Sequence, residues 1–130
     1  MISIIAGAVV MFIVGAIWFT VLFGKLWSRL MNRTEADIAK AKALGMTRQM
    51  VIMFVLNLVS AYTLHYLIYM MGLSLTDSLF IVLIIWIAFT LPSVMNAYLW
   101  ESKSMKLVLI NAGGSLAAFL AGSAAIYYIR

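Results

Sequence analysis

The chain has 130 residues, of which 66% are hydrophobic and 10% are charged, and its mean hydropathy is +1.11. Soluble domains carry about 25% charged residues, so this composition excludes the soluble class and indicates an integral membrane protein of a single domain, residues 1–130. The nine Lys and Arg residues outnumber the four Asp and Glu residues to give a net charge of +5, and the absence of Cys excludes disulfides, thiolate metal sites and cysteine nucleophiles.

Four apolar segments are long enough to cross a bilayer, whose hydrocarbon core of about 30 Å requires about 20 residues of helix. They are residues 2–23, 50–71, 78–100 and 107–129. The first segment has no basic residues before it and no small-residue cleavage site, so we expect it to be retained rather than removed as a signal peptide. The sequence therefore predicts an all-α fold, a four-helix transmembrane bundle.

Residues that begin or end helices flank these segments. Gly72 is expected to end the second span, because glycine adopts the left-handed conformation that closes many helices. Short polar side chains that cap helix N-termini precede the later spans. The expected N-terminal caps are Thr47, then Thr76 with Asp77, and then Ser102 or Ser104.

Lys and Arg are distributed unevenly among the loops. The loop between the first two spans holds Lys25, Arg29, Arg33, Lys40, Lys42 and Arg48, and the loop between the last two holds Lys103 and Lys106. The loop of residues 72–77 holds none. Because short loops rich in Lys and Arg stay in the cytoplasm, we expect both basic loops to be cytoplasmic and both termini to lie outside.

The first basic loop begins with an amphipathic pattern. At about 100° per residue, one side carries the apolar residues and the other carries the polar and basic ones. The apolar side is Leu26, Trp27, Leu30 and Met31, and the polar side is Lys25, Ser28, Arg29, Asn32 and Arg33. This pattern predicts a short interfacial helix whose lipid-facing basic residues, together with Trp27 at headgroup depth, are Lys25, Arg29 and Arg33. Its role is lipid sensing, partner docking or simple anchoring of the first span.

The rest of that loop predicts a short solvated helix. Thr34 is a candidate N-cap with an acidic residue three positions later, and Gly45 is a candidate stop. The charged residues between them are spread around the helix axis, which favours contact with water on all sides.

A candidate polar layer lies in the cytoplasmic half of the predicted bundle. Counting about 1.5 Å per residue from the cytoplasmic ends places its four side chains within one or two helical turns of each other. They are Trp18, Asn57, Asn96 and Asn111. The layer is either a binding site or hydrated vestibule, or a set of interhelical hydrogen bonds that sets helix register. Asparagine amides neither titrate nor attack, so the layer supports binding or register and not catalysis.

The last span carries small residues at intervals of four, which permit close approach of another helix. We interpret this surface as a helix-packing or oligomer face, and we expect a homo-oligomer. The residues of the face are Gly114, Ala118, Ala121, Gly122 and Ala125.

Residues for catalysis or metal binding are sparse. His65 is the only histidine, and no Asp or Glu lies within a span; Asp77 and Glu101 fall on opposite sides of the membrane. We therefore expect no catalytic residue, no metal and no cofactor. Pro92, the only proline, cannot donate a backbone hydrogen bond to Ala88 and predicts a kink in the third span.

Four short runs carry a family resemblance: Gly15-Ala16-Ile17-Trp18-Phe19, Phe23-Gly24-Lys25-Leu26-Trp27, Thr34-Glu35 and Ile110-Asn111-Ala112-Gly113. Together they resemble the small bacterial four-helix membrane proteins of domain of unknown function 1761. That family commonly has Trp-Tyr followed by a turn such as Ser-Pro, whereas this chain has Trp18-Phe19 and then Thr20-Val21. The resemblance covers nearly the whole chain and implies the same fold in a bacterial inner membrane, but no activity.

These observations favour a non-catalytic multi-pass membrane protein of structural, interaction or lipid-binding type. The expected partners are anionic lipid headgroups at the first cytoplasmic loop, further copies of the chain and a larger membrane protein, and not nucleic acid, because no basic run alternates with stacking aromatic residues. The alternative is a subunit of a small-molecule or ion transporter or channel, with its polar site in the cytoplasmic half of the bundle.

Overall fold

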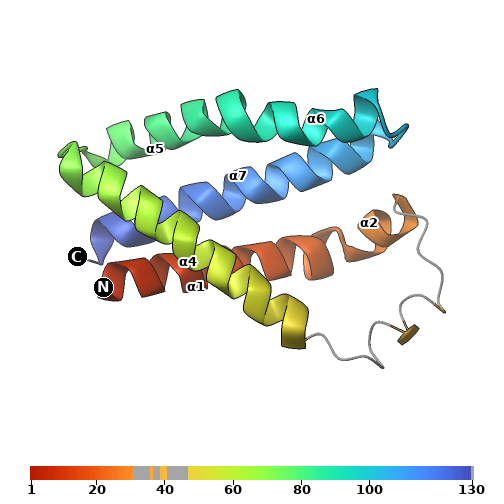
Figure 1. Cartoon of the computed structure of the whole chain (residues 1–130), viewed down its shortest axis with the longest axis horizontal. Coiled ribbons are helices and arrows are strands. Elements are labelled where there is room, and N and C mark those ends of the chain that lie inside the picture. The colour runs from red at the N-terminus through yellow and green to blue at the C-terminus, as the bar shows by residue number, and fades with distance from the viewer. Residues whose placement is uncertain (31–35, 37–38, 41–46, 130) are drawn as a thin grey trace.

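The computed structural model of the chain describes residues 1–30, 36, 39–40 and 47–129. The described residues contain helices and no strand. Four helical spans are long and apolar enough to cross a membrane, as predicted, and they lie side by side as a bundle (Figure 1). The spans are Ile2–Leu22, Thr47–Met70, Leu75–Leu99 and Met105–Tyr128.

Two of the spans are interrupted by a π-helical segment. The first span is α1 (Ile2–Ile17) followed by η1 (Trp18–Leu22), after which the chain bends into the short helix α2 (Gly24–Leu30). The third span is α5 (Leu75–Ile85), η2 (Trp86–Thr90) and α6 (Leu91–Leu99). The remaining spans are the uninterrupted helices α4 (Thr47–Met70) and α7 (Met105–Tyr128).

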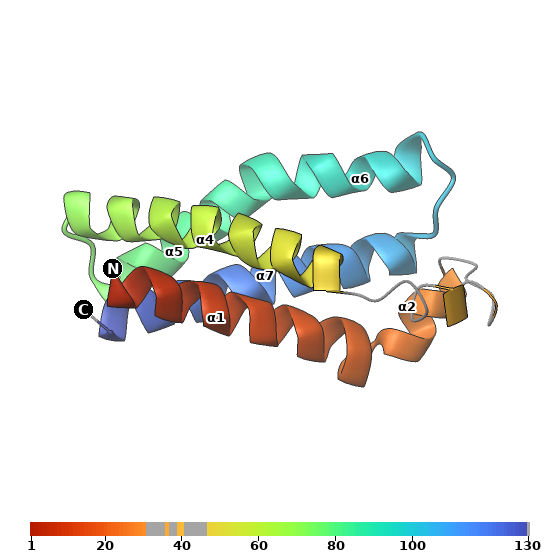
Figure 2. The ribbon, with the colours of Figure 1, turned by 60° about the horizontal axis from the view of Figure 1, so that its bottom comes forward.

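Helix α7 is the centre of the bundle. It packs against α1, α4, α5 and α6, and its closest packing is with α1. Helix α4 crosses α1 obliquely in the view of Figure 1, and Figures 1 and 2 both show it diverging from α6. Among the described residues, α4 makes few or no contacts with α5 and α6. The helices therefore form an arc around α7 that is open between α4 and α6.

Small residues bring α1 and α7 together in the half of the bundle that contains both termini. A Cβ atom added to Gly7 would lie 2.6 Å from Cγ1 of Ile126, and one added to Gly122 would lie 2.5 Å from Cγ of Met11. Close approach of this kind strengthens dispersion contacts between helices in lipid, where the hydrophobic effect does not hold them together. The buried core of this half is Ala8, Met11, Ala61, Leu64, Ile68, Val82 and Ile126.

The helix ends follow local hydrogen bonding. Gly72 has a positive φ of 60°, as expected for the residue that ends α4. Ser104 caps α7, because its Oγ accepts from the backbone N–H of Leu107 at 3.1 Å. The third span, however, begins at Ser74 and not at Thr76 with Asp77, because Ser74 Oγ accepts from the N–H of Asp77 at 3.2 Å and so satisfies a first-turn donor.

The third span contains the π-helical segment η2 just before Pro92, the residue at which the sequence predicts a kink. Pro92 is the second residue of α6, where a missing N–H costs least, and the widened turn lies just before it. The backbone N–H of Leu91 bonds the carbonyl of Trp86, and Ser93 Oγ donates to the carbonyl of Phe89 at 2.9 Å. These hydrogen bonds satisfy backbone groups that have no other acceptor or donor in lipid.

Candidate functional site

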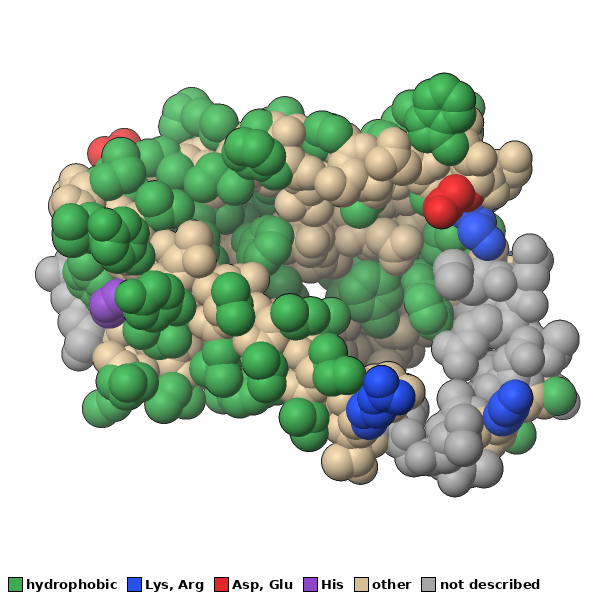
Figure 3. Space-filling model, in the orientation of Figure 1, with side chains coloured by type: hydrophobic (Ala, Val, Ile, Leu, Met, Phe, Trp, Pro, Cys, Tyr) green, Lys and Arg blue, Asp and Glu red, His purple; other side chains and the backbone are tan. Residues whose placement is uncertain are grey.

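The described cations gather at one end of the bundle, which we call the basic end. Figure 3 shows Lys and Arg side chains toward this end and the histidine at the opposite one. The residues that define the basic end are Lys25, Arg29, Arg48, Lys103 and Lys106. Among the described residues, Glu101 is the carboxylate at this end, while Asp77 lies at the other end in the first turn of α5. The two ends therefore differ strongly in charge.

Three tryptophans converge on one short stretch of α7 toward the basic end. Trp18 Nε1 donates to the carbonyl of Ile110 at 2.8 Å. Trp27 Nε1 donates to Oδ1 of Asn111 at 3.1 Å, and Trp86 Nε1 donates to the carbonyl of Ala112 at 3.1 Å. The indoles come from η1, α2 and η2, so three separate elements are tied to three consecutive residues of the central helix. We call Trp18, Trp27, Trp86 and residues 110–114 the tryptophan cluster.

Glycines in α7 make room for the Trp18 indole. A Cβ atom added to Gly113 would lie 2.8 Å from Cζ2 of Trp18. One added to Gly114 would lie 2.8 Å from Cδ1 of Trp18 and 3.0 Å from Cε2 of Phe19. Real Cβ contacts are not this short, so the aromatic rings rest directly on the backbone of α7. The Gly113-Gly114 pair is therefore part of the binding surface for the indole.

Ring contacts hold the cluster together between η1 and α2. The Trp18 and Phe23 rings have centroids 4.9 Å apart, and Phe19 and Trp27 pack edge to face with centroids 6.0 Å apart. Aromatic pairs in such geometry contribute about 0.5–1.5 kcal/mol beyond the burial of their surface. These contacts attach α2 to the end of the first span as well as to α7.

The π-helical segment η1 and the bend after it allow Trp18 and Trp27 to face the same helix. In an unbroken α-helix, residues nine positions apart point about 180° away from each other. The N–H of Phe23 bonds the carbonyl of Trp18 at 3.0 Å, and Phe23 then leaves helical geometry with φ −126° and ψ 12°. The family pattern places a turn such as Ser-Pro after its aromatic pair, and this chain has Thr20-Val21 there, which by sequence lacks a helix break. The structure nevertheless has the irregular segment η1 at these residues.

Helix α2 has the two sides that its sequence predicts. Lys25 and Arg29 are exposed, and Leu26, Trp27 and Leu30 are half-buried. The apolar side packs on the protein rather than on lipid, because Trp27 bonds Asn111 and contacts Phe19. Met31, Asn32 and Arg33, and the solvated helix predicted from Thr34 to Leu44, lie outside the described residues, apart from residues 36 and 39–40, which are helical and exposed.

The structure does not bring the predicted polar layer together. Trp18 and Asn111 belong to the tryptophan cluster, whereas Asn57 is half-buried on α4 and Asn96 is exposed on α6. Among the described residues, no hydrogen bond joins two of the three asparagine side chains. The depths counted along the helices place the three asparagines at similar levels, but α4 and α6 diverge. The side chain that the third span directs to α7 at this level is Trp86, which donates to the carbonyl of Ala112.

The small-residue face of α7 is used for packing within one chain. Gly114 contacts Trp18 and Phe19, and Gly122 contacts Met11 of α1. Ala118, Ala121 and Ala125 are half-buried. The sequence predicts that this face serves either helix packing or oligomer formation. Its two glycines serve helix packing within the chain.

His65 lies near the end opposite the basic end and is hydrogen bonded. Its Nδ1 lies 2.9 Å from Oγ of Ser3, and its ring is 4.4 Å from that of Tyr69, whose hydroxyl donates to the carbonyl of Ile126 at 2.9 Å. These contacts join α1, α4 and α7. In the part of the chain that the structure describes, no three His, Asp or Glu side chains group together as metal ligands would.

Comparison with known proteins agrees with the resemblance seen in the sequence. A family described as "Protein of unknown function (DUF1761)" matches residues 2–127. No curated protein and no solved structure matches the chain. The matched region contains the first three helical spans, the fourth span except its last residue, and the whole tryptophan cluster. The chain therefore belongs to the DUF1761 family of proteins of unknown function.

Proposed function

We propose that this protein is a non-catalytic, multi-pass membrane protein that binds anionic lipid headgroups at its basic end. The observation that supports this most directly is the arrangement of α2. Its apolar side is tied to α7 through Trp27 and Asn111, while Lys25 and Arg29 are exposed. A short helix held in this way presents its cations at the level where the spans leave the membrane.

The charge of the basic end gives the proposal its expected strength. Each Lys or Arg near an anionic leaflet contributes about 1 kcal/mol of attraction. The basic end carries Lys25, Arg29, Arg48, Lys103 and Lys106 against the one described carboxylate there, Glu101. By the rule that positive loops stay inside, this end faces the cytoplasm across the inner (plasma) membrane and both termini lie outside.

The tryptophan cluster supports a positioning role rather than a chemical one. Its three indole N–H groups donate hydrogen bonds to two backbone carbonyls and one asparagine side chain of α7. Indole and amide groups do not titrate in the physiological range, so the cluster lacks an acid, a base and a nucleophile. Its effect is to hold η1, α2 and η2 at fixed positions around the central helix.

The other readings of the sequence have less support. A transporter or channel subunit would need polar groups along one passage, and Asn57 and Asn96 lie on helices that diverge. Gly114 and Gly122 of the small-residue face already contact side chains of the same chain, so homo-oligomer formation through α7 would use the half-buried alanines of that face, Ala118, Ala121 and Ala125. Flux measured in liposomes tests the first reading, and subunit number measured in lipid tests the second.

Thermal stabilisation by lipid tests the proposed function. The purified protein in a mild non-ionic detergent is titrated with phosphatidylglycerol or with phosphatidylcholine of the same chain length. Anionic lipid should raise the melting temperature more, because a ligand that binds only the folded state stabilises it. Lys25→Gln with Arg29→Gln should remove about 2 kcal/mol of this attraction, or about 30-fold in affinity.

The control keeps both charges and exchanges the residues, Lys25→Arg with Arg29→Lys. It should retain the preference for anionic lipid, because headgroup attraction depends on charge at this surface. Equal stabilisation of the parent protein by the two lipids would refute the proposal.

A further inference from the structure

A groove lies between α1 and the part of α4 nearest the basic end. Its volume is about 370 Å³. Its lining is apolar apart from one threonine, and it consists of Phe12, Thr47, Met50, Val51, Phe54 and Val55. Two of these lining residues, Phe12 and Phe54, pack edge to face with ring centroids 6.1 Å apart. The groove therefore carries an aromatic ring from each of the two helices and reaches Thr47, the first described residue of α4.

The depth of the groove matches one leaflet of a bilayer. Thr47 is the first described residue of α4, and Val55, the furthest lining residue on that helix, lies eight residues, or about 12 Å, further along. Half of a hydrocarbon core is about 15 Å thick. Val51 and Val55 are 56% and 50% exposed, so the chain itself leaves the groove accessible from the surrounding lipid.

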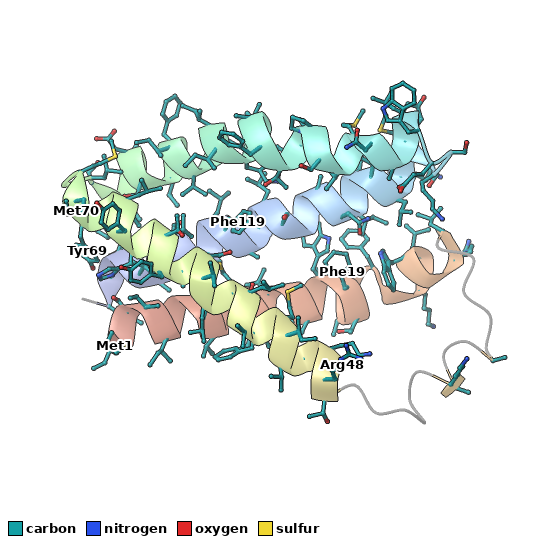
Figure 4. All side chains as sticks on the ribbon, viewed as in Figure 1. Met1, Phe19, Arg48, Tyr69, Met70 and Phe119 are labelled. Atoms are coloured by element: carbon teal, nitrogen blue, oxygen red, sulfur yellow. The ribbon has the colours of Figure 1, made fainter. Side chains whose placement is uncertain are left out.

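An exposed arginine is adjacent in sequence to one of the residues that line the groove. Arg48 follows Thr47 directly and is exposed, and Figure 4 shows it at the start of α4. Glu101 follows α6, which diverges from this part of α4 (Figures 1 and 2). The site therefore combines an apolar channel at acyl-chain depth with a positive charge and a hydroxyl at headgroup depth.

We propose that this groove holds one anionic phospholipid. One acyl chain lies against Val51 and Val55, and the phosphate meets the Arg48 guanidinium and the Thr47 hydroxyl. Guanidinium groups are suited to phosphate because their N–H donors form a planar fork. This assignment rests on the proposed function, since it requires that the basic end attract anionic lipid, and it adds a defined place for one molecule and a requirement for its acyl chain.

Native mass spectrometry of the protein in mild detergent tests the assignment. The probes are phosphatidylglycerol and phosphatidylcholine with identical acyl chains, added at equal concentration. We expect one phosphatidylglycerol to be retained after the others dissociate. Val51→Trp should prevent its retention because the larger side chain fills the groove, and Arg48→Gln should weaken it about fivefold through loss of one cation.

Two control variants share the chemistry but lie away from the groove. Val59→Trp places the same ring on the same helix at a valine that is 61% exposed and outside the groove. Lys106→Gln removes an exposed cation of the basic end at the start of α7. Val59→Trp should keep the retained phosphatidylglycerol, and Lys106→Gln should weaken its retention less than Arg48→Gln does, because Lys106 is on α7, which does not line the groove. The four variants should also melt within a few degrees of the parent protein, because each of these side chains is exposed.

The outcomes separate this assignment from the proposed function. In one outcome, the parent protein prefers phosphatidylglycerol, but Val51→Trp retains this lipid as well as Val59→Trp does. That result would overturn the groove as the binding site and leave the proposed function standing. Loss of the retained phosphatidylglycerol in Arg48→Gln, with normal retention in Val51→Trp, would mean that the headgroup binds without an acyl-chain site. That result would also overturn the assignment. A parent protein without any preference for anionic lipid would refute both. A dimer whose formation Val51→Trp blocks would assign the groove to a second copy instead.

Discussion

Replacing Gly114 with alanine should destabilise the protein, although the same change usually strengthens a helix. The added Cβ would lie 2.8 Å from Cδ1 of Trp18 and 3.0 Å from the Phe19 ring. The indole cannot move away freely, because its Nε1 donates to the carbonyl of Ile110 at 2.8 Å and its ring also rests on Gly113. The collision must therefore break the hydrogen bond or separate η1 from α7.

The expected magnitude comes from two opposing effects. Inserting a methyl group into a well-packed site costs about 1–3 kcal/mol. Alanine in place of glycine within a helix gains up to about 1 kcal/mol. Gly15 in α1 offers a matched control, because no atom lies within 4 Å of a Cβ added there. Since the helix-propensity gain is common to both variants, the difference between Gly114→Ala and Gly15→Ala measures the collision alone, about 1–3 kcal/mol.

Reversible unfolding in mixed detergent micelles, followed by tryptophan fluorescence and circular dichroism, is the appropriate assay. Gly15→Ala should be as stable as the parent protein or slightly more stable, and Gly114→Ala should be less stable. Combining Gly114→Ala with Trp18→Ala should remove the part of the glycine penalty that comes from Trp18 and leave the smaller part that comes from the Phe19 ring at 3.0 Å. Equal stability of Gly114→Ala and Gly15→Ala would mean that the Trp18 indole does not rest on α7, and the tryptophan cluster would have to be abandoned.

Three further predictions concern one hydrogen bond, the membrane topology of the spans and one helix cap. Trp27→Phe and Asn111→Leu should be non-additive by about 0.6 kcal/mol, the average for interhelical hydrogen bonds in membranes, and strict additivity in the same unfolding assay would exclude their hydrogen bond. Cysteines introduced at Thr76 and Lys106 should react with an impermeant reagent from opposite sides of the membrane, since they lie in the first turns of α5 and α7 at opposite ends; labelling from one side would contradict the four-span arrangement. Ser104→Ala should cost about 1 kcal/mol through loss of the α7 cap, whereas Ser104→Asp should retain the stability of the parent.

The helical spans and several of their ends can be predicted from sequence because they depend on local chemistry. In lipid every backbone group needs a partner, so an apolar run of about 20 residues folds as one helix whatever its neighbours are. Gly72 and Ser104 act within a single turn, and their roles follow from residue type alone. The cap at Ser74 was missed because two capping residues, Ser74 and Thr76, stand close together and only the observed bond to Asp77 distinguishes them.

The candidate site was only partly predictable. The sequence singled out Trp18, Trp27 and Asn111, and the resemblance included the Ile110–Gly113 stretch, yet Trp86 was not assigned to the same site. A signal was available, because an indole N–H within a span has no acceptor in lipid and must find one on another helix. Grouping Asn57 and Asn96 with Asn111 was misleading, since depth along each helix says nothing about whether two helices are neighbours.

The amino-acid sequence by itself determined that four helical spans form, where several of them begin or end, and which end of the bundle is basic. These properties follow from hydropathy, residue type and charge counted along the chain. Tertiary structure alone decided that α7 is central and that η1 and η2 turn their tryptophans toward it. The physical reason is that a π-helical turn changes the direction in which every later side chain points, so the meeting of Trp18, Trp27 and Trp86 on Ile110, Asn111 and Ala112 depends on helix rotation and contact between distant segments.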